Sequence, residues 1–210
     1  MPRKKSTRKK VASKKAVKRV LPKIEKDVKT LSDGLSYSFN NFRRIWNFYW
    51  VLIPIFGWLA FAGYSVKIIK SLLNKEFHEL PAFGSFWENF RVGFFFFLYS
   101  LVISLVIMVI TALPFIGWIF SIYFILISPL LTINYAKNTK FVDGFDFAKV
   151  TRGIFNKNFG EYFIAYVKSI VVGVLFLLAS ILIITMVLTI PAISFVKYYY
   201  FVDYYNKYLE

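Results

Sequence analysis

The chain of 210 residues contains no cysteine, a single histidine and only 11 acidic residues. Without cysteine it cannot form disulfides, which excludes the small secreted scaffolds that depend on them. A zinc site or a cysteine nucleophile needs more His or Cys than the chain has. Because 27 residues are Lys or Arg, the scarcity of acidic groups leaves a formal net charge of +16.

Charged residues make up only 18% of the chain, whereas 58% of it is hydrophobic and 21% is aromatic. Soluble domains average about 45–50% apolar and about 25% charged residues. A soluble fold of this length cannot hide so much apolar surface, so lipid must solvate part of it. The composition therefore excludes a soluble enzyme and a disordered protein, and predicts a multi-pass protein of the cell membrane with the lipid bilayer as its main partner.

Residues 1–30 differ in chemistry from the rest of the chain. They hold 13 Lys and Arg against Glu25 and Asp27, whereas the other 180 residues carry 14 basic and 9 acidic groups. So dense a charge repels itself and buries little, so we expect a largely disordered cytoplasmic tail over 1–30 and a membrane-embedded helical domain over 31–210. The tail is not a signal peptide, since the first apolar run begins near Trp46.

Three interpretations of the tail remain open. It can simply hold the N terminus in the cytoplasm, it can bind anionic lipid headgroups, or it can bind the phosphates of RNA or DNA without reading their sequence. The cations that would make such contacts are ten of its first twenty residues: Arg3, Lys4, Lys5, Arg8, Lys9, Lys10, Lys14, Lys15, Lys18 and Arg19.

Three stretches with little or no charge mark the membrane. Asn47–Val66 has no charged residue in 20, Val92–Ala136 has none in 45, and Tyr162–Val196 has only Lys168 in 35. Because one span needs about 20 residues, these stretches predict one crossing, two crossings, and between one and two. Short polar segments rich in Gly, Pro and Asn connect them.

A repeated pattern accompanies the apolar stretches. An Asn-Phe pair opens each run, at Asn41-Phe42, Asn89-Phe90 and Asn158-Phe159. Inside the runs, two segments share the pattern P-x-x-G-W and a third keeps a Pro, a small residue and an aromatic one: Pro54–Trp58, Pro114–Trp118 and Pro191–Phe195.

This repeat is typical of a helical hairpin. Asn can cap the first helix, Pro fits the first turn of the second, Gly or Ser permits the tight turn, and Trp or Phe anchors it at the interface. A Pro can instead kink one long helix. At Pro114 the 45 uncharged residues exceed one span, which favours a turn, whereas at Pro54 both a short hairpin and a single span over Trp46–Val66 remain open.

Basic residues flank the apolar stretches and are absent from the predicted hairpin tips. The positive-inside rule then places both termini and both polar loops in the cytoplasm. The sequence therefore predicts an all-α fold: a polytopic membrane helical bundle of three helical hairpins, with about 4–6 membrane helices, preceded by the disordered basic tail. The tyrosines near Lys197 are expected to form an aromatic belt with cations between their rings.

The order of motifs resembles a known family. The run Leu52–Tyr64 is followed by Lys67–Lys70, then Glu79-Leu80-Pro81, then Trp87–Phe90. This order is similar to that of the prokaryotic membrane proteins of domain-of-unknown-function family 4013 (DUF4013), in which a Gly-Tyr pair ends an apolar helix, a basic helix follows and a Leu-Pro turn leads to the next span. The resemblance covers residues 35–205 and implies a membrane helical protein without a catalytic motif.

Catalytic motifs are absent from the sequence, which has no phosphate loop, no G-x-S-x-G and no H-E-x-x-H. His78 is expected on the surface of a polar loop. Asp143 and Asp146 flank a glycine, which is typical of a turn, although two carboxylates can also hold a hard metal ion. We therefore expect a non-enzymatic protein with a structural, assembly or interaction role and no cofactor.

The alternative is a small transporter or lipid-handling protein. Polar side chains at membrane depth are functional candidates because burying them in lipid is costly. Three such residues define a candidate intramembrane polar site: Lys168, Asn134 and Tyr166. Lys168 can instead extend its side chain to the interface. The apolar stretches contain no carboxylate, which coupled carriers usually need, and this argues against the alternative.

A peptide of residues 1–30 tests the electrostatic interpretation of the tail. Its binding to anionic vesicles or RNA should weaken steeply with salt, because the Debye length falls to about 8 Å at 0.15 M. A scrambled peptide of equal charge should bind equally well in a fluorescence titration. Binding that requires the native order, or that ignores salt, would instead identify a specific recognition element.

Overall fold

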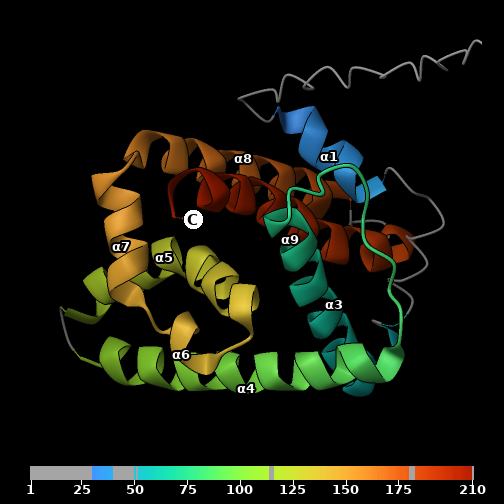
Figure 1. Ribbon diagram of the computed structural model, residues 1–210, viewed down its shortest axis with the longest axis horizontal. Helices are drawn as coiled ribbons and strands as arrows, with labels where there is room; N and C mark the ends of the chain where they lie inside the picture. Colours follow the sequence, from blue (N-terminus) through green and yellow to red (C-terminus); the bar gives the residue numbers. More distant parts are fainter. Residues whose placement is uncertain (1–29, 40–49, 51, 114–115, 180–182, 210) are drawn as a thin grey trace, which may run out of the picture.

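The computed structural model of the chain describes residues 30–39, 50, 52–113, 116–179 and 183–209 (Figure 1). Its helices are α1 (Leu31–Phe39), α3 (Phe56–Leu73), α4 (Phe86–Thr111), α5 (Ile116–Asn138), α6 (Phe141–Gly144), α7 (Phe147–Asn156), α8 (Phe159–Ala179) and α9 (Ile183–Tyr208). The predicted all-α fold is confirmed. Apart from Thr30, the predicted basic tail lies outside the described residues.

Helix α9 packs against several other helices. In Figure 1, α4 lies along one side of the molecule and α8 with α9 along the opposite side, while α3 and α7 are inclined between them. α9 contacts α1, α3, α5 and α8, and α4 packs chiefly on α3. Large side chains of α9 such as Phe195, Phe201 and Tyr205 are accordingly buried.

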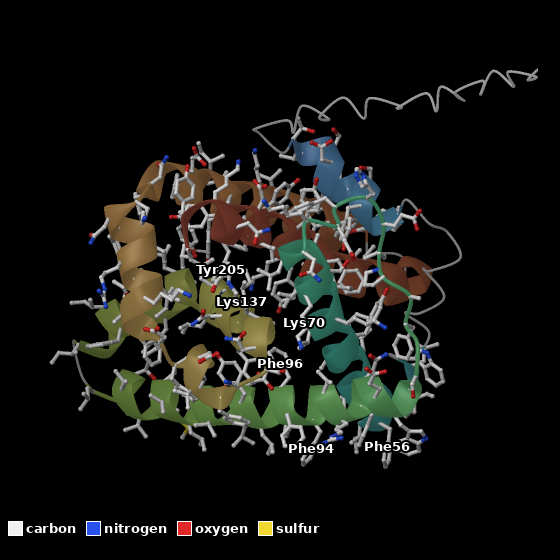
Figure 2. The ribbon with its side chains drawn as sticks, viewed as in Figure 1. Phe56, Lys70, Phe94, Phe96, Lys137 and Tyr205 are labelled. Atoms are coloured by element: carbon white, nitrogen blue, oxygen red, sulfur yellow. The ribbon has the colours of Figure 1, made fainter. Side chains whose placement is uncertain are left out.

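Three of the described helices are long and apolar enough to cross a membrane, namely α4, α5 and α8. All three expose large apolar side chains over much of their length. Figure 2 shows the two sides of α4: Phe94 points away from the bundle, whereas Phe96 points into it and packs on Tyr135 with ring centroids 5.6 Å apart. The outward faces are those that lipid would solvate.

The predicted division of the 45-residue apolar stretch into two helices is confirmed, because α4 ends at Thr111 and α5 begins at Ile116, while Pro114 itself lies outside the described residues. Near Pro54 the chain also turns: residues 52–55 are not α-helical, and α3 begins only at Phe56. One continuous span over Trp46–Val66 is therefore wrong. The other arm of the predicted first hairpin lies largely outside the described residues.

The two P-x-x-G-W segments have the same structural role. The backbone N–H of Gly57 and that of Gly117 each donate to the carbonyl four residues earlier, at 3.1 and 2.9 Å. A Cβ at either glycine would overlap a carbonyl oxygen of the preceding segment. Trp58 and Trp118 are 58% and 81% exposed, as expected for side chains that anchor at an interface. In both copies the glycine therefore lies where the new helix passes close to the backbone of the preceding segment.

The turn predicted at Pro191 is wrong. α9 begins at Ile183 and continues through Pro191, so α8 and α9 form a hairpin whose connection lies between Ala179 and Ile183. A proline removes one helical hydrogen bond, which a helix packed among others can tolerate. The third copy also has Ser194 where the other two have the glycine that their turns require.

Of the predicted asparagine caps, one is confirmed, one is wrong and one lies outside the described residues. Asn158 caps α8, because its Oδ1 accepts a hydrogen bond from the N–H of Glu161 at 3.1 Å. Asn89 instead lies inside the first turn of α4, where its Nδ2 donates to the carbonyl of Phe83 at 2.7 Å. The cap prediction is wrong for Asn89 because α4 begins earlier, at Phe86. Asn41 lies outside the described residues.

Helices α3 and α4 cross in backbone contact at Gly63 and Gly93. A Cβ at Gly63 would overlap the carbonyl oxygen of Asn89, and a Cβ at Gly93 would overlap that of Leu59. Small residues allow membrane helices to approach this closely. Because the opposing atoms belong to the backbone, they cannot move aside without separating the helices.

Substitution of either glycine tests this crossing. Gly63→Ala and Gly93→Ala should each lower the free energy of unfolding by about 1–3 kcal/mol, as overpacking does, in thermal unfolding of the detergent-solubilised protein. Gly173→Ala in α8 is the control, because a Cβ there would make only an ordinary contact at 3.9 Å with Ile193. It should be neutral or stabilising. Equal effects of all three substitutions would contradict the close crossing.

Candidate functional site

Polar side chains gather where the C-terminal ends of α3, α5 and α9 lie together and α7 packs on α5. We define the lysine site as Lys70, Lys137, Lys149, Asn134 and Tyr205. Lys70 and Lys137 occupy the last turns of α3 and α5, and Lys149 lies in the first turn of α7. Figure 2 labels Lys70, Lys137 and Tyr205 in the middle of the view, between the outer helices.

The buried centre of the lysine site is a tyrosine–asparagine pair. Tyr205 is fully buried, and its hydroxyl donates to Oδ1 of Asn134 at 2.7 Å. Asn134 is only 4% exposed, and its Nδ2 donates to the backbone carbonyl of Asp143. Buried polar groups are stable only when they are hydrogen-bonded. This pair therefore ties α5 to both α9 and α6 at one point.

Two ammonium groups lie against the ring of Tyr205. Nζ of Lys137 is 5.7 Å and Nζ of Lys149 is 5.5 Å from the ring centroid, within the range of a cation–π interaction. Lys149 also donates to the Tyr205 hydroxyl at 3.2 Å and to Oδ1 of Asn134 at 3.5 Å. One neutral ring thus lies within reach of two ammonium groups from different helices.

Lys70 adds a third cation from a different helix. Its Nζ donates to Oγ1 of Thr139, directly after α5, at 3.4 Å. Among the described residues, neither Lys70 nor Lys149 has a carboxylate within 4.0 Å. All three lysines are half-buried, so solvent still reaches them. The geometry is therefore that of a partly desolvated cationic site.

The aspartates of the neighbouring segment have turn and capping roles, as the Asp-Gly pattern predicts. Oδ2 of Asp143 accepts a hydrogen bond from Nδ2 of Asn138 at 2.5 Å. Oδ1 of Asp146 accepts the backbone N–H of Lys149 at 2.9 Å and so caps α7. His78 is exposed in the loop between α3 and α4, as predicted.

The three residues of the predicted intramembrane polar site fall into two groups. Asn134 belongs to the lysine site. Lys168 and Tyr166 lie on α8, where Nζ of Lys168 is 6.0 Å from the ring centroid of Tyr200 and Tyr166 packs on Phe201 at 5.7 Å. A shared transport or lipid-handling role for the three remains a prediction.

The predicted aromatic belt is wrong in its location. Tyr199, Tyr200, Tyr204 and Tyr205 are all at most 3% exposed, because α9 is surrounded by other helices. Cations do lie over two of these rings, those of Tyr200 and Tyr205, but they come from α5, α7 and α8 and not from the stretch around Lys197.

Sequence reasoning missed the lysines of the site. Lys137 directly follows an apolar stretch, Lys70 lies four residues after another, and Lys149 lies inside a polar connection. Such a pattern is a signal for the membrane boundary rather than for a common site. Their meeting depends on which helix ends come together in space, and the charge pattern alone does not contain that information.

Removal of one hydroxyl tests the buried pair. Tyr205→Phe should lower the free energy of unfolding by about 1–3 kcal/mol, because it takes the donor from the buried oxygen of Asn134. Tyr166→Phe is the control, since the Tyr166 hydroxyl has no hydrogen bond among the described residues. Thermal unfolding in detergent measures both variants, and an equal response would show that the tyrosine–asparagine hydrogen bond contributes nothing.

A family model described as "Protein of unknown function (DUF4013)" matches residues 48–188. No curated protein and no solved structure matches the chain. The matched range contains α3 to α8 and the start of α9, and with them Asn134 and the three lysines of the site but not Tyr205. Because the match covers more than half of its length, the chain belongs to the DUF4013 family.

Proposed function

We propose that this protein is a non-enzymatic, multi-pass protein of the cell membrane that presents a basic cytoplasmic surface, including its N-terminal arm, to anionic lipid. The observation that carries the proposal is the hydrogen bond from Lys70 to Thr139. It joins the C-terminal end of α3 to that of α5, and so supports a common side for the two polar connections that follow these helices.

A second contact supports the same arrangement. Nδ2 of Asn206, near the end of α9, donates to the carbonyl of Leu72 at 3.2 Å. The C-terminal ends of α3, α5 and α9 thus lie together. This is expected if α3 and α9 also enter the membrane beside the three candidate spans. Basic residues favour the cytoplasmic side, and each Lys or Arg beside an anionic leaflet gains about 1 kcal/mol. Nucleic acid is the other polyanion that the arm can bind.

The proposal of a non-enzymatic role rests on the sequence, which contains no catalytic motif. The alternative is a small transporter or lipid-handling protein, for which the buried position of Asn134 would provide a polar group within the bundle. Both ends of that amide already have protein partners. A role in holding the helices together therefore accounts for Asn134 more simply than a role in transport.

Single cysteines test the topology, because the chain has none of its own. Cysteines at Ser32, Asn74 and Asn138 should react with an impermeant maleimide only from the cytoplasmic side. A cysteine at Trp118, which is 81% exposed and lies at the other end of α5, should react only from outside. Reaction of Asn74→Cys from outside would contradict the common side of the two polar connections.

A further inference from the structure

We propose that the lysine site binds a phosphate group, supplied either by the headgroup of an anionic lipid or by a free phosphate anion. This inference rests on the proposed cytoplasmic placement of the site and names the ligand that the basic surface would hold there. It concerns a fixed site in the folded helices rather than the N-terminal arm.

The charge of the site favours an anion. Three ammonium groups come from three helices, and two of them share the ring of Tyr205. Lys70 and Lys149 have no carboxylate partner in the part of the chain that the structure describes. An anion bound among these ammonium groups would be attracted by each of them, and more so where water is partly excluded.

The donors that remain free match the oxygens of a phosphate. An ammonium group has three N–H donors. The described residues supply only one acceptor to Lys70, the hydroxyl of Thr139, and two to Lys149, the hydroxyl of Tyr205 and the amide oxygen of Asn134. Donors are therefore left on two separate helices, and the oxygens of one phosphate can accept from both.

The site is also held in place before any ligand binds. The Tyr205 hydroxyl and the Asn134 amide are buried and bonded to each other, and both position Lys149. A lysine on an exposed surface would lose much side-chain entropy on binding, whereas these groups have already lost part of it. The smaller entropy loss on binding distinguishes the lysine site from exposed lysines elsewhere on the chain.

The position of the site favours a lipid headgroup as the source of the phosphate. Lys137 lies in the last turn of α5, one of the three candidate membrane helices, and Asn138 beside it is exposed. The end of a membrane helix lies at the depth of the headgroups. A lipid phosphate at that depth would meet the ammonium groups at the ends of these helices.

Photocrosslinking of the full-length chain in nanodiscs tests the proposal. The probe is a phosphatidylglycerol with a photoreactive headgroup, and phosphatidylcholine with the same photoreactive group is the zwitterionic comparison. Mass spectrometry then locates the cross-linked peptides. The wild-type chain should give phosphatidylglycerol adducts around Lys70, Lys137 or Lys149 in addition to adducts on residues 1–30.

A charge-matched pair of triple variants separates a defined site from diffuse attraction. K70Q/K137Q/K149Q should lose adducts at the site about tenfold or more, as expected for three lost phosphate contacts, while its tail adducts remain. K75Q/K140Q/K157Q removes three exposed lysines and the same charge, and should keep the adducts at the site. If the first variant does not fold, Lys149→Gln compared with Lys157→Gln gives the same test.

The outcomes distinguish this inference from the proposed function. Adducts on residues 1–30 alone would overturn the lysine site and leave the proposed function standing, whereas no phosphatidylglycerol adduct anywhere would contradict both. Equal losses in the two triple variants, or equal labelling by phosphatidylcholine, would also overturn the site.

Inorganic phosphate identifies the source of the ligand. If it raises the unfolding temperature of the wild-type chain in neutral detergent but not that of K70Q/K137Q/K149Q, the site accepts free phosphate. If only phosphatidylglycerol does so, the headgroup is the ligand. If neither stabilises the wild-type chain more than the variant, the proposal is wrong.

Discussion

The backbone contact between α3 and α4 at Gly63 and Gly93 is the constraint on which the rest of the arrangement depends. With no side chain between them, the helices have little freedom to slide or to change their crossing. The position of α3 then fixes its C-terminal turn beside α5 and α9, where Lys70 bonds Thr139 and Leu72 accepts from Asn206. The crossing of α3 and α4, which involves no polar side chain, thus places Lys70 of α3 at the lysine site.

Tyrosine hydroxyls supply partners for backbone carbonyl groups of loops and helix ends, which are costly to leave unpaired where water is excluded. The hydroxyl of Tyr64 donates to Pro81 at 2.8 Å, that of Tyr99 to Gly144 at 3.0 Å, and that of Tyr204 to Gly153 at 2.9 Å. Each ring packs in the apolar interior while its hydroxyl satisfies a backbone carbonyl. This dual character explains why so many tyrosines lie inside the bundle rather than at its boundary.

The sequence predicts features that depend on one local segment. The division between α4 and α5 follows from a charge-free stretch too long for one span, and the cap by Asn158 from a side chain at a helix start. Pro191 was misleading because a proline also fits a packed helix, and only the missing glycine distinguishes that segment from the two true turns. The lysine site could not be predicted, since it depends on helix ends that are distant in the sequence. Among its members, only Asn134 has a local signal, as a polar residue inside an apolar stretch.

The most direct test of this account is chemical cross-linking between the ends of α3 and α5 in the native membrane. A cysteine pair at Lys70 and Thr139 should be joined by a short bis-maleimide, because the Lys70 side chain reaches Thr139. A pair at Phe56 and Thr139 should not be joined, because Phe56 begins α3 and lies about 21 Å along the helix from Lys70. Failure of the first pair to cross-link, or equal cross-linking of both, would contradict the convergence of helix ends that creates the site.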